Sequence, residues 1–278
     1  MDIAGQSAKA EQLRNLHRGP RILILPNAWD VISARVIEDA GFPAVATSSA
    51  AIAAVLGYPD GERVPRNEML EAVSRIARAV TVPVTADLEA GYATTSVEMA
   101  EFARAVVATG VVGLNLEDVT GEDESSHVEV GRQVEKIAAV RAASLSAGVA
   151  LVINARTDIF LLPIGPEETR FERAVERLRA YRAAGADCVF APGVRDAETT
   201  GKLVRAIDAP LNILLQPGGV PVRELEKLGV ARASAGSGPH RAALTRLKEI
   251  ALSLREYGDH TPLFENLTTW SDVNRLLS

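Results

Sequence analysis

The stretch Val84-Thr85-Ala86-Asp87-Leu88-Glu89-Ala90-Gly91-Tyr92 decides the fold that we predict for this chain of 278 residues. In it, a short apolar strand runs into two acidic residues and then into a glycine turn. Because strand side chains alternate between faces, Asp87 and Glu89 are expected to point the same way if the extended path continues that far. Two later segments have the same form and end in Glu117-Asp118 and Arg156-Thr157-Asp158. Three consecutive strands therefore carry charge at their carboxyl ends.

Strands of this kind alternate with helices along the chain. The predicted strands cover 21–26, 43–47, 82–86, 111–116, 149–155, 187–191, 211–215 and 230–234. The predicted helices cover 6–18, 31–40, 50–56, 66–80, 95–109, 131–147, 166–185, 196–207, 221–228, 239–257 and 268–277. Short connections in this order indicate a parallel sheet with right-handed crossovers. We predict an α/β fold, a single (β/α)₈ TIM barrel over residues 1–278, with an N-terminal helix and a C-terminal helical extension.

An open, doubly wound sheet is the alternative architecture. Eight strand–helix units over this length favour the closed barrel, and no phosphate-binding GxGxxG follows the first strand.

Composition excludes several classes of function. The net charge is -6 and no basic stripe appears, which argues against a nucleic-acid partner. The one cysteine, Cys188, supports neither a disulfide framework nor a zinc cluster. No signal peptide is evident, and no apolar run reaches the roughly 18 residues of a membrane span. We therefore expect a cytoplasmic protein with no membrane association.

In a barrel, alternation decides which side chains enter the interior. The predicted inward set is Thr85 and Asp87, then Gly113, Asn115 and Glu117, then Val152, Asn154 and Arg156. The carboxyl ends of barrel strands line the active-site face. Asp87, Glu89 and Glu117 would supply hard oxygen ligands there, which suits Mg²⁺ or Mn²⁺. Arg156 would supply a fork for an anionic substrate.

From about residue 25 to residue 257, the sequence resembles the isocitrate lyase/phosphoenolpyruvate mutase superfamily. The motifs that carry the resemblance are Pro26-Asn27-Ala28-Trp29-Asp30, Thr47-Ser48-Ser49, Gly57-Tyr58-Pro59-Asp60, Asp87-Leu88-Glu89-Ala90-Gly91-Tyr92, Leu116-Glu117-Asp118 and Asn154-Ala155-Arg156-Thr157-Asp158. The resemblance implies a (β/α)₈ barrel, usually with its last helix swapped between subunits of a homodimer or homotetramer. It also implies Mg²⁺, a small α-keto or 2-hydroxy acid, and cleavage or formation of C–C or P–C bonds.

The resemblance also implies roles for single residues. Asp87 would bind the metal directly, and Glu89 and Glu117 would bind it through water. Asp60 corresponds to the acidic residue near the metal and the reacting group. Arg156 would clamp the substrate carboxylate or phosphonate. The amides of Ser49 and Ala50, together with Ser48, would hold a carboxylate at a helix N-terminus.

Two features depart from the family pattern. Glu89 stands where the family commonly has aspartate. The lyases carry a Lys-x-Cys-Gly-His gating loop after the fourth strand, and the phosphonopyruvate enzymes carry a Lys-Thr-Asn-Ser-like loop, whereas residues 119–127 match neither. In that loop, His127 is either a general acid or a solvated side chain. Asn212 either reaches the substrate pocket or makes a structural hydrogen bond.

The predicted function is a Mg²⁺-dependent lyase that cleaves a C–C bond in a small α-keto or 2-hydroxy di- or tricarboxylic acid. Three alternatives stay open. They are an oxaloacetate-type decarboxylase, a P–C bond enzyme similar to phosphonopyruvate hydrolase or phosphoenolpyruvate mutase, and a catalytically silent binder of α-keto acids.

Overall fold

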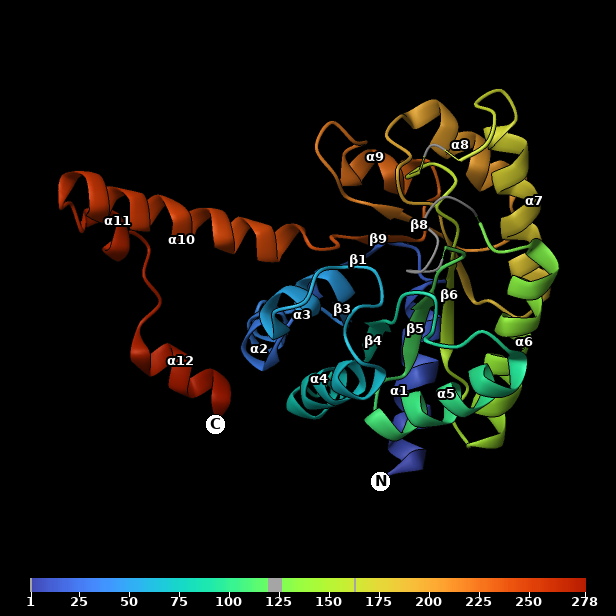
Figure 1. Cartoon of the computed structure of the whole chain (residues 1–278), viewed down its shortest axis with the longest axis horizontal. Helices are drawn as coiled ribbons and strands as arrows, with labels where there is room; N and C mark the ends of the chain where they lie inside the picture. Colours follow the sequence, from blue (N-terminus) through green and yellow to red (C-terminus); the bar gives the residue numbers. More distant parts are fainter. Residues whose placement is uncertain (1, 120–126, 163) are drawn as a thin grey trace.

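A parallel sheet of nine strands forms the centre of the molecule, which we describe from a computed structural model covering residues 2–119, 127–162 and 164–278 (Figure 1). The strands are β1 (Leu23–Leu25), β2 (Asn27–Ala28), β3 (Val45–Thr47), β4 (Val84–Asp87), β5 (Gly113–Leu116), β6 (Val152–Arg156), β7 (Cys188–Phe190), β8 (Leu211–Leu214) and β9 (Arg232–Ser234). Their order in the sheet is β1-β9-β8-β7-β6-β5-β4-β3-β2.

The two end strands, β1 and β2, are consecutive pieces of chain on either side of Pro26. The first piece pairs with β9, where Leu23 lies opposite Arg232, and the second pairs with β3, where Asn27 lies opposite Ala46. Proline has no amide hydrogen, so the ladder is interrupted at Pro26 and the chain changes partner. Together the two pieces close the cylinder, which confirms the (β/α)₈ barrel. The prediction of one first strand over 21–26 is corrected to two short strands.

Helices follow the strands in alternation and surround the sheet. They are α1 (Ile3–Leu16), α2 (Val31–Asp39), α3 (Ser49–Leu56), α4 (Arg66–Ala79), α5 (Ser96–Thr109), α6 (Val130–Ser146), α7 (Arg170–Ala183), α8 (Ala197–Ala206), α9 (Val222–Lys227), α10 (Gly238–Tyr257), α11 (Thr261–Phe264) and α12 (Trp270–Leu277). Local signals set many of their ends. Asp30 caps α2 through the amide of Ser33, and Gly110 ends α5 in a left-handed conformation with φ of 95°.

The N-terminal helix α1 closes the amino-terminal mouth of the barrel. Leu13 of this helix is fully buried, and a methyl group added at Gly113, the first residue of β5, would lie 3.1 Å from its side chain. The amide nitrogen of the Gln6 side chain donates to the carbonyls of Val107 and Val111, each at 2.9 Å. The opposite mouth, where the strands end, is left for the site.

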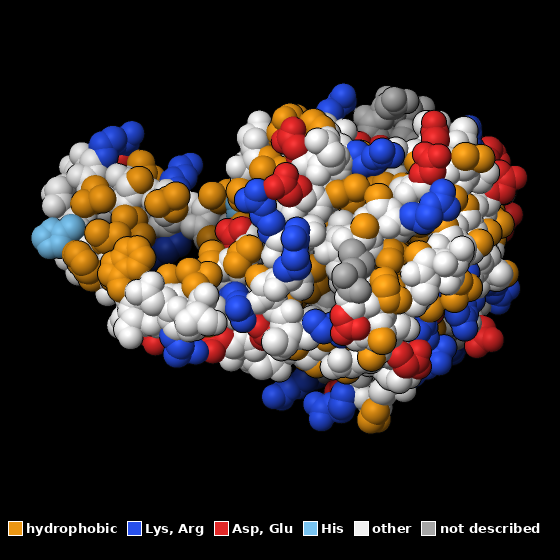
Figure 2. Space-filling view, turned by 90° about the horizontal axis from the view of Figure 1, so that it is seen from below, with side chains coloured by type: hydrophobic (Ala, Val, Ile, Leu, Met, Phe, Trp, Pro, Cys, Tyr) orange, Lys and Arg blue, Asp and Glu red, His pale blue; other side chains and the backbone are white. Residues whose placement is uncertain are grey.

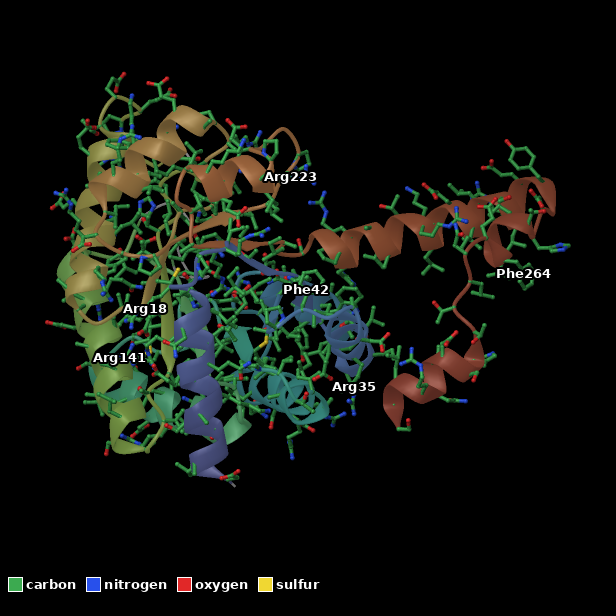
Figure 3. All side chains as sticks on the ribbon, turned by 180° about the vertical axis from the view of Figure 1, so that it is seen from behind. Arg18, Arg35, Phe42, Arg141, Arg223 and Phe264 are labelled. Carbon is green, nitrogen blue, oxygen red and sulfur yellow. The ribbon has the colours of Figure 1, made fainter. Side chains whose placement is uncertain are left out.

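The C-terminal helices α10, α11 and α12 form an arm that projects away from the barrel (Figure 1). Hydrophobic side chains gather on the arm in the space-filling view (Figure 2), and Phe264 lies near its far end (Figure 3). Trp270 is 81% exposed. The arm turns back at α12, where Arg275 pairs with Asp39 of α2 at 2.7 Å. Within the described ranges, no helix combines the length and apolar character needed to cross a membrane.

Candidate active site

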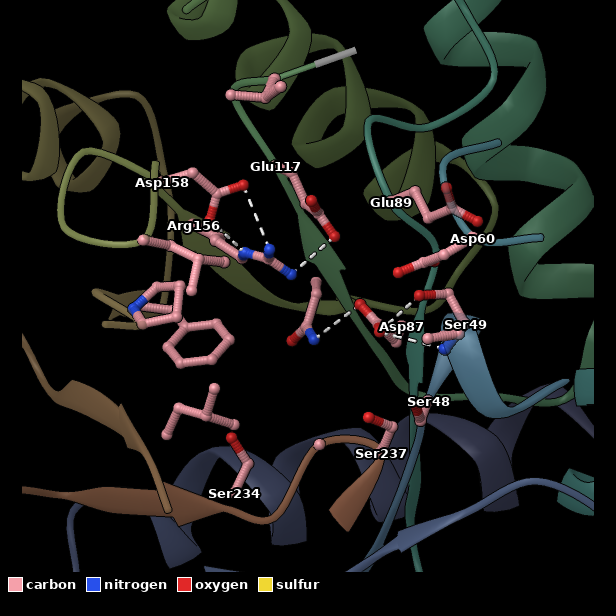
Figure 4. Close-up of a pocket in the computed structure, with 18 of the residues that line it drawn as sticks. Ser48, Ser49, Asp60, Asp87, Glu89, Glu117, Arg156, Asp158, Ser234 and Ser237 are labelled. Atoms are coloured by element: carbon pink, nitrogen blue, oxygen red, sulfur yellow. Dashed lines mark hydrogen bonds and ion pairs between the residues drawn. The ribbon is translucent and has the colours of Figure 1, made fainter. Parts of the chain in front are cut away.

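A cavity of about 280 Å³ lies at the carboxyl ends of the strands. Eight of the ten predicted site residues line it, namely Ser48, Ser49, Ala50, Asp60, Asp87, Glu89, Glu117 and Arg156. In the close-up, Asp60, Asp87 and Glu89 lie on one side of the cavity, and Arg156 with Asp158 lies on the other (Figure 4). Three strand ends that are far apart in the sequence therefore meet at one place, as the barrel predicted.

Asp87 is fixed by hydrogen bonds from two neighbouring elements. Its Oδ1 accepts a bond from Asn115 Nδ2 at 3.0 Å, and its Oδ2 accepts bonds from the amide and hydroxyl of Ser49 at 3.1 and 2.8 Å. The chain of bonds continues inside the barrel, because Asn154 Nδ2 donates to Asn115 Oδ1 at 2.8 Å. The inward faces predicted for β4, β5 and β6 are thus joined side chain to side chain.

The Ser49 amide, which the resemblance assigned to a substrate carboxylate, holds Asp87 in this structure. Ser48 caps α3, with its hydroxyl accepting a bond from the amide of Ala51 at 3.3 Å. A substrate role for Ser48, Ser49 and Ala50 stays a prediction.

Glu89 lines the cavity, but from a turn after the strand rather than from the extended strand that was predicted. Strand β4 ends at Asp87, and Glu89 has φ of 53°, so the extended path does not continue to it. Its carboxylate accepts bonds from the amide of Glu62 and from the Tyr92 hydroxyl, the latter at 3.2 Å. Burial raises the pKa of Glu89 to about 7, and the negative charges of Asp87 and Asp60 add to this effect.

Arg156 lies between two carboxylates. Its Nε and Nη2 donate to the two oxygens of Asp158 at 2.6 and 3.1 Å, and its Nη1 donates to Glu117 at 2.8 Å. The Phe190 ring lies 5.8 Å from its Cζ. Burial would lower the pKa of Arg156, but the charges of Glu117 and Asp158 outweigh burial and raise it. The guanidinium is therefore charged and held in one orientation.

Negative charge exceeds positive charge among the described side chains that line the cavity. Burial raises the pKa of Glu117 well above its ordinary value, Arg156 opposes this rise, and the neighbouring carboxylates of Asp158, Asp87 and Glu89 add to it. Buried carboxylates that lack enough counter-charge favour a cation. Among the residues that the structure describes, no three Asp, Glu, His or Cys side chains form a ready-made metal cage. The oxygen donors fit an ion such as Mg²⁺, which keeps several of its own waters.

Two predicted residues lie outside the cavity wall. His127 is half-buried, burial lowers its pKa, and its Nε2 has no hydrogen-bond partner among the described residues. Asn212 is fully buried and exchanges hydrogen bonds with Ser234 at 3.1 and 3.2 Å, and Ser234 lines the cavity. Residues 120–126 of the loop that departs from the family pattern lie outside the described part of the chain.

Sequence reasoning missed Asn27 and Glu62. The Asn27 amide nitrogen donates to the carbonyl of Thr47 at 2.6 Å, and its oxygen accepts bonds from the amides of Ala235 and Gly236 at 2.9 and 2.8 Å. Asn27 therefore links the end of β3 to the segment after β9, beside the cavity. Its place in the Pro26–Asp30 motif was the available signal. Glu62 lies in a turn-rich loop with no periodicity, so its contact with Glu89 had no signal in the sequence.

Comparisons with known proteins agree with this geometry. The profile of the phosphoenolpyruvate phosphomutase family matches residues 13–255. A crystal structure from Burkholderia cenocepacia J2315, described as a candidate lyase/mutase, is 35% identical, with a TM-score of 0.90 and coverage of 98% of this chain and 96% of that chain. The crystal structure of 2,3-dimethylmalate lyase, a member of the PEP mutase/isocitrate lyase superfamily, is 26% identical, with a TM-score of 0.85 and coverage of 97% and 95%. Oxaloacetate decarboxylase 2 of Pseudomonas fluorescens is 30% identical, with coverage of 87% of this chain and 81% of the relative.

Proposed function

This chain belongs to the phosphoenolpyruvate phosphomutase family, and from that premise we propose that it is a lyase dependent on Mg²⁺ or Mn²⁺. Its substrate would be a small α-keto or 2-hydroxy dicarboxylate in which a carbon–carbon bond breaks. The observation that carries this proposal is the guanidinium of Arg156, held by Asp158 and Glu117 and facing Asp87 and Glu89 in one cavity. A volume of about 280 Å³ suits a substrate of a few carbon atoms.

The residues of the cavity would have separate roles in binding the metal and the substrate. Asp87 would hold the cation directly, and Glu89 and Glu117 would hold it through water. The cation, when bound, supplies a Lewis acid for the substrate carbonyl or hydroxyl oxygen. Arg156 would bind the substrate carboxylate and stabilise the charge that collects on an enolate oxygen as the bond breaks. Asp158 keeps the guanidinium oriented for that task.

Decarboxylation of an oxaloacetate-like acid is the second candidate, and two observations favour it. An oxaloacetate decarboxylase is 30% identical over 246 residues. His127, the candidate proton donor for a larger leaving carbanion, does not line the cavity. Release of CO₂ needs no base, and the enolate that remains can take its proton from water, so decarboxylation does not require His127.

The test is a substrate panel. Purified protein is incubated with Mg²⁺ and oxaloacetate, 2,3-dimethylmalate or 2-methylisocitrate, and pyruvate is measured by a coupled dehydrogenase. We expect pyruvate from at least one acid and loss of the activity when EDTA removes the metal. CO₂ release separates decarboxylation from the other cleavages. Absence of product from all three acids would contradict a lyase.

Two further measurements address the remaining alternatives. ³¹P NMR with phosphonopyruvate would reveal P–C bond chemistry. A thermal shift with oxalate and Mg²⁺, without turnover of any acid, would indicate a silent binder instead.

We also propose that the protein is a homodimer or homotetramer in which the arm docks on a second copy. The exposed apolar side chains of the arm support this, because Leu247, Tyr257, Phe264 and Trp270 are each at least 60% exposed on a single chain.

A further inference from the structure

Helix α6 lies behind the acidic turns and holds their backbone. Lys136 Nζ donates to the carbonyl of Ala90 at 2.6 Å, and Gln133 Nε2 donates to the carbonyl of Glu117 at 2.9 Å. Both side chains are buried, at 3% and 0% exposed. They stand three residues apart and therefore lie on one face of the helix. One helix face thus holds the turn after β4 and the end of β5 together.

The two held segments are also bonded to each other. The amide of Glu117 donates to the carbonyl of Glu89 at 2.9 Å. A shift in either segment would therefore displace the other, and with it a carboxylate that lines the cavity.

The turn after β4 has a backbone that needs support. Glu89 and Tyr92 have φ of 53° and 50°, a left-handed conformation that is unfavourable for residues with a Cβ atom. Such residues persist only where their surroundings hold them. Here Glu62 accepts a bond from the amide of Tyr92 at 2.9 Å, and Lys136 binds the carbonyl of Ala90 between the two.

A buried lysine is a costly way to make that contact. Removing an ammonium group from water is unfavourable unless an opposite charge compensates it. In the part of the chain that the structure describes, the Lys136 ammonium group donates to the Ala90 carbonyl and has no carboxylate within ion-pair distance, so the more distant charges of Glu62 and Asp118 offset its burial only in part. A methionine would fill similar space without that cost. The presence of a lysine therefore points to a task at the turn rather than to packing.

We propose that Lys136 and Gln133 are positioning residues that set the carboxylates of Glu89 and Glu117 for the divalent cation. This inference rests on the proposed function, since it concerns the same site. Neither side chain lines the cavity, so both act through the backbone they hold. Outer partners of this kind orient metal-binding side chains, and their loss typically weakens metal affinity about 10- to 100-fold.

The test is Mn²⁺ binding, measured by the EPR signal of free Mn²⁺ in the absence of substrate. Wild type is compared with Lys136→Met and with Arg132→Met, a control that removes an exposed cation from the same helix. We expect Lys136→Met to raise the Mn²⁺ dissociation constant by about tenfold or more and Arg132→Met to leave it unchanged. Equal affinities of wild type and folded Lys136→Met would overturn the inference.

Gln133→Leu provides a second variant if Lys136→Met does not fold. It removes the bond to the Glu117 carbonyl without changing charge, and it is expected to weaken Mn²⁺ binding in the same direction. A purely structural role would lower the melting temperature and leave the affinity, measured well below it, unchanged. Failure of wild type to bind Mn²⁺ would contradict the proposed function and this inference together. Wild-type binding with unchanged variants contradicts this inference alone.

Discussion

Arg156 is the residue on which substrate binding is proposed to depend. Its three nitrogens contact Asp158 and Glu117, an arrangement that a single ammonium group cannot reproduce. Arg156→Lys is expected to reduce kcat/KM about 10- to 100-fold, which corresponds to the roughly 1.5 to 3 kcal/mol of a hydrogen bond to a charged group. Arg75→Lys, at an exposed position of α4 outside the site and the arm, is the matched control. A kcat/KM for Arg156→Lys that equals the wild-type value would show that substrate binding does not depend on Arg156.

His17 links folding stability to pH, at a distance from the site. It is 4% exposed, its Nδ1 lies 2.8 Å from the Leu13 carbonyl, and burial lowers its pKa from 6.5 to about 4, helped by the positive charge of Arg232. Between these values the unfolded chain binds a proton that the folded chain excludes, so stability falls as the pH is lowered from about 6.5 to about 4.

Urea unfolding at pH 7.5 and pH 5 measures the effect. The free energy of unfolding of wild type is expected to fall by about 2 kcal/mol more than that of His17→Gln over this interval. Parallel losses in the two proteins would show that His17 is not the group responsible.

The direction of a side chain could be predicted from the sequence where neighbouring residues determine it, and could not where a distant residue does. The inward parity of Asp87, Asn115 and Asn154 follows from strand alternation alone, and the structure joins these three side chains. The conformation of Glu89 depends instead on Glu62, 27 residues away in sequence, and no local pattern indicates that contact.

At the scale of elements, the cap of α2 can be tested directly. The Asp30 carboxylate accepts a bond from the Ser33 amide at 2.8 Å, and the Ser33 hydroxyl accepts one from the Asp30 amide at 3.1 Å. Asp30→Ala should lower the free energy of unfolding by about 1 kcal/mol, because it removes the carboxylate that accepts the bond from the Ser33 amide and so weakens the reciprocal cap. Asp30→Asn keeps an acceptor and should stay close to wild type. Urea titrations compare the three, and an unchanged midpoint for Asp30→Ala would mean that the cap does not contribute.

Helix and strand ends were likewise predictable where the signal lies within the segment itself. Asp30 and Gly110 carry start and stop signals within the segment they bound, and the helices there lie close to the predicted ranges. The division at Pro26 was not predicted, because it depends on which neighbours the strand meets when the cylinder closes. Helix α7 begins at Arg170 rather than at residue 166, since Pro166 allows a helix start but does not require one.

At the scale of the whole molecule, the barrel buries its own hydrophobic core, whereas the apolar side chains of the arm stay exposed. The arm contacts its own barrel again at α12, which lies beside α2 and forms with it the exposed ion pair of Arg275 and Asp39. Exposed ion pairs contribute little, about 0 to 1 kcal/mol. Apolar side chains along α10 to α12 therefore need another surface, and a second copy of the chain would supply one by symmetry.

Light scattering after size exclusion tests that arrangement. Wild type is expected at two or four times the 29.5 kDa of one chain. The double variant Leu247→Glu with Trp270→Glu places charge on the arm at side chains that are 62% and 81% exposed, and it is expected to run as a single chain. Leu145→Glu makes the same kind of change at a 55% exposed leucine of α6, and it should keep the wild-type mass. A monomeric wild type, or an arm variant of unchanged mass, would mean that the arm does not hold the assembly together.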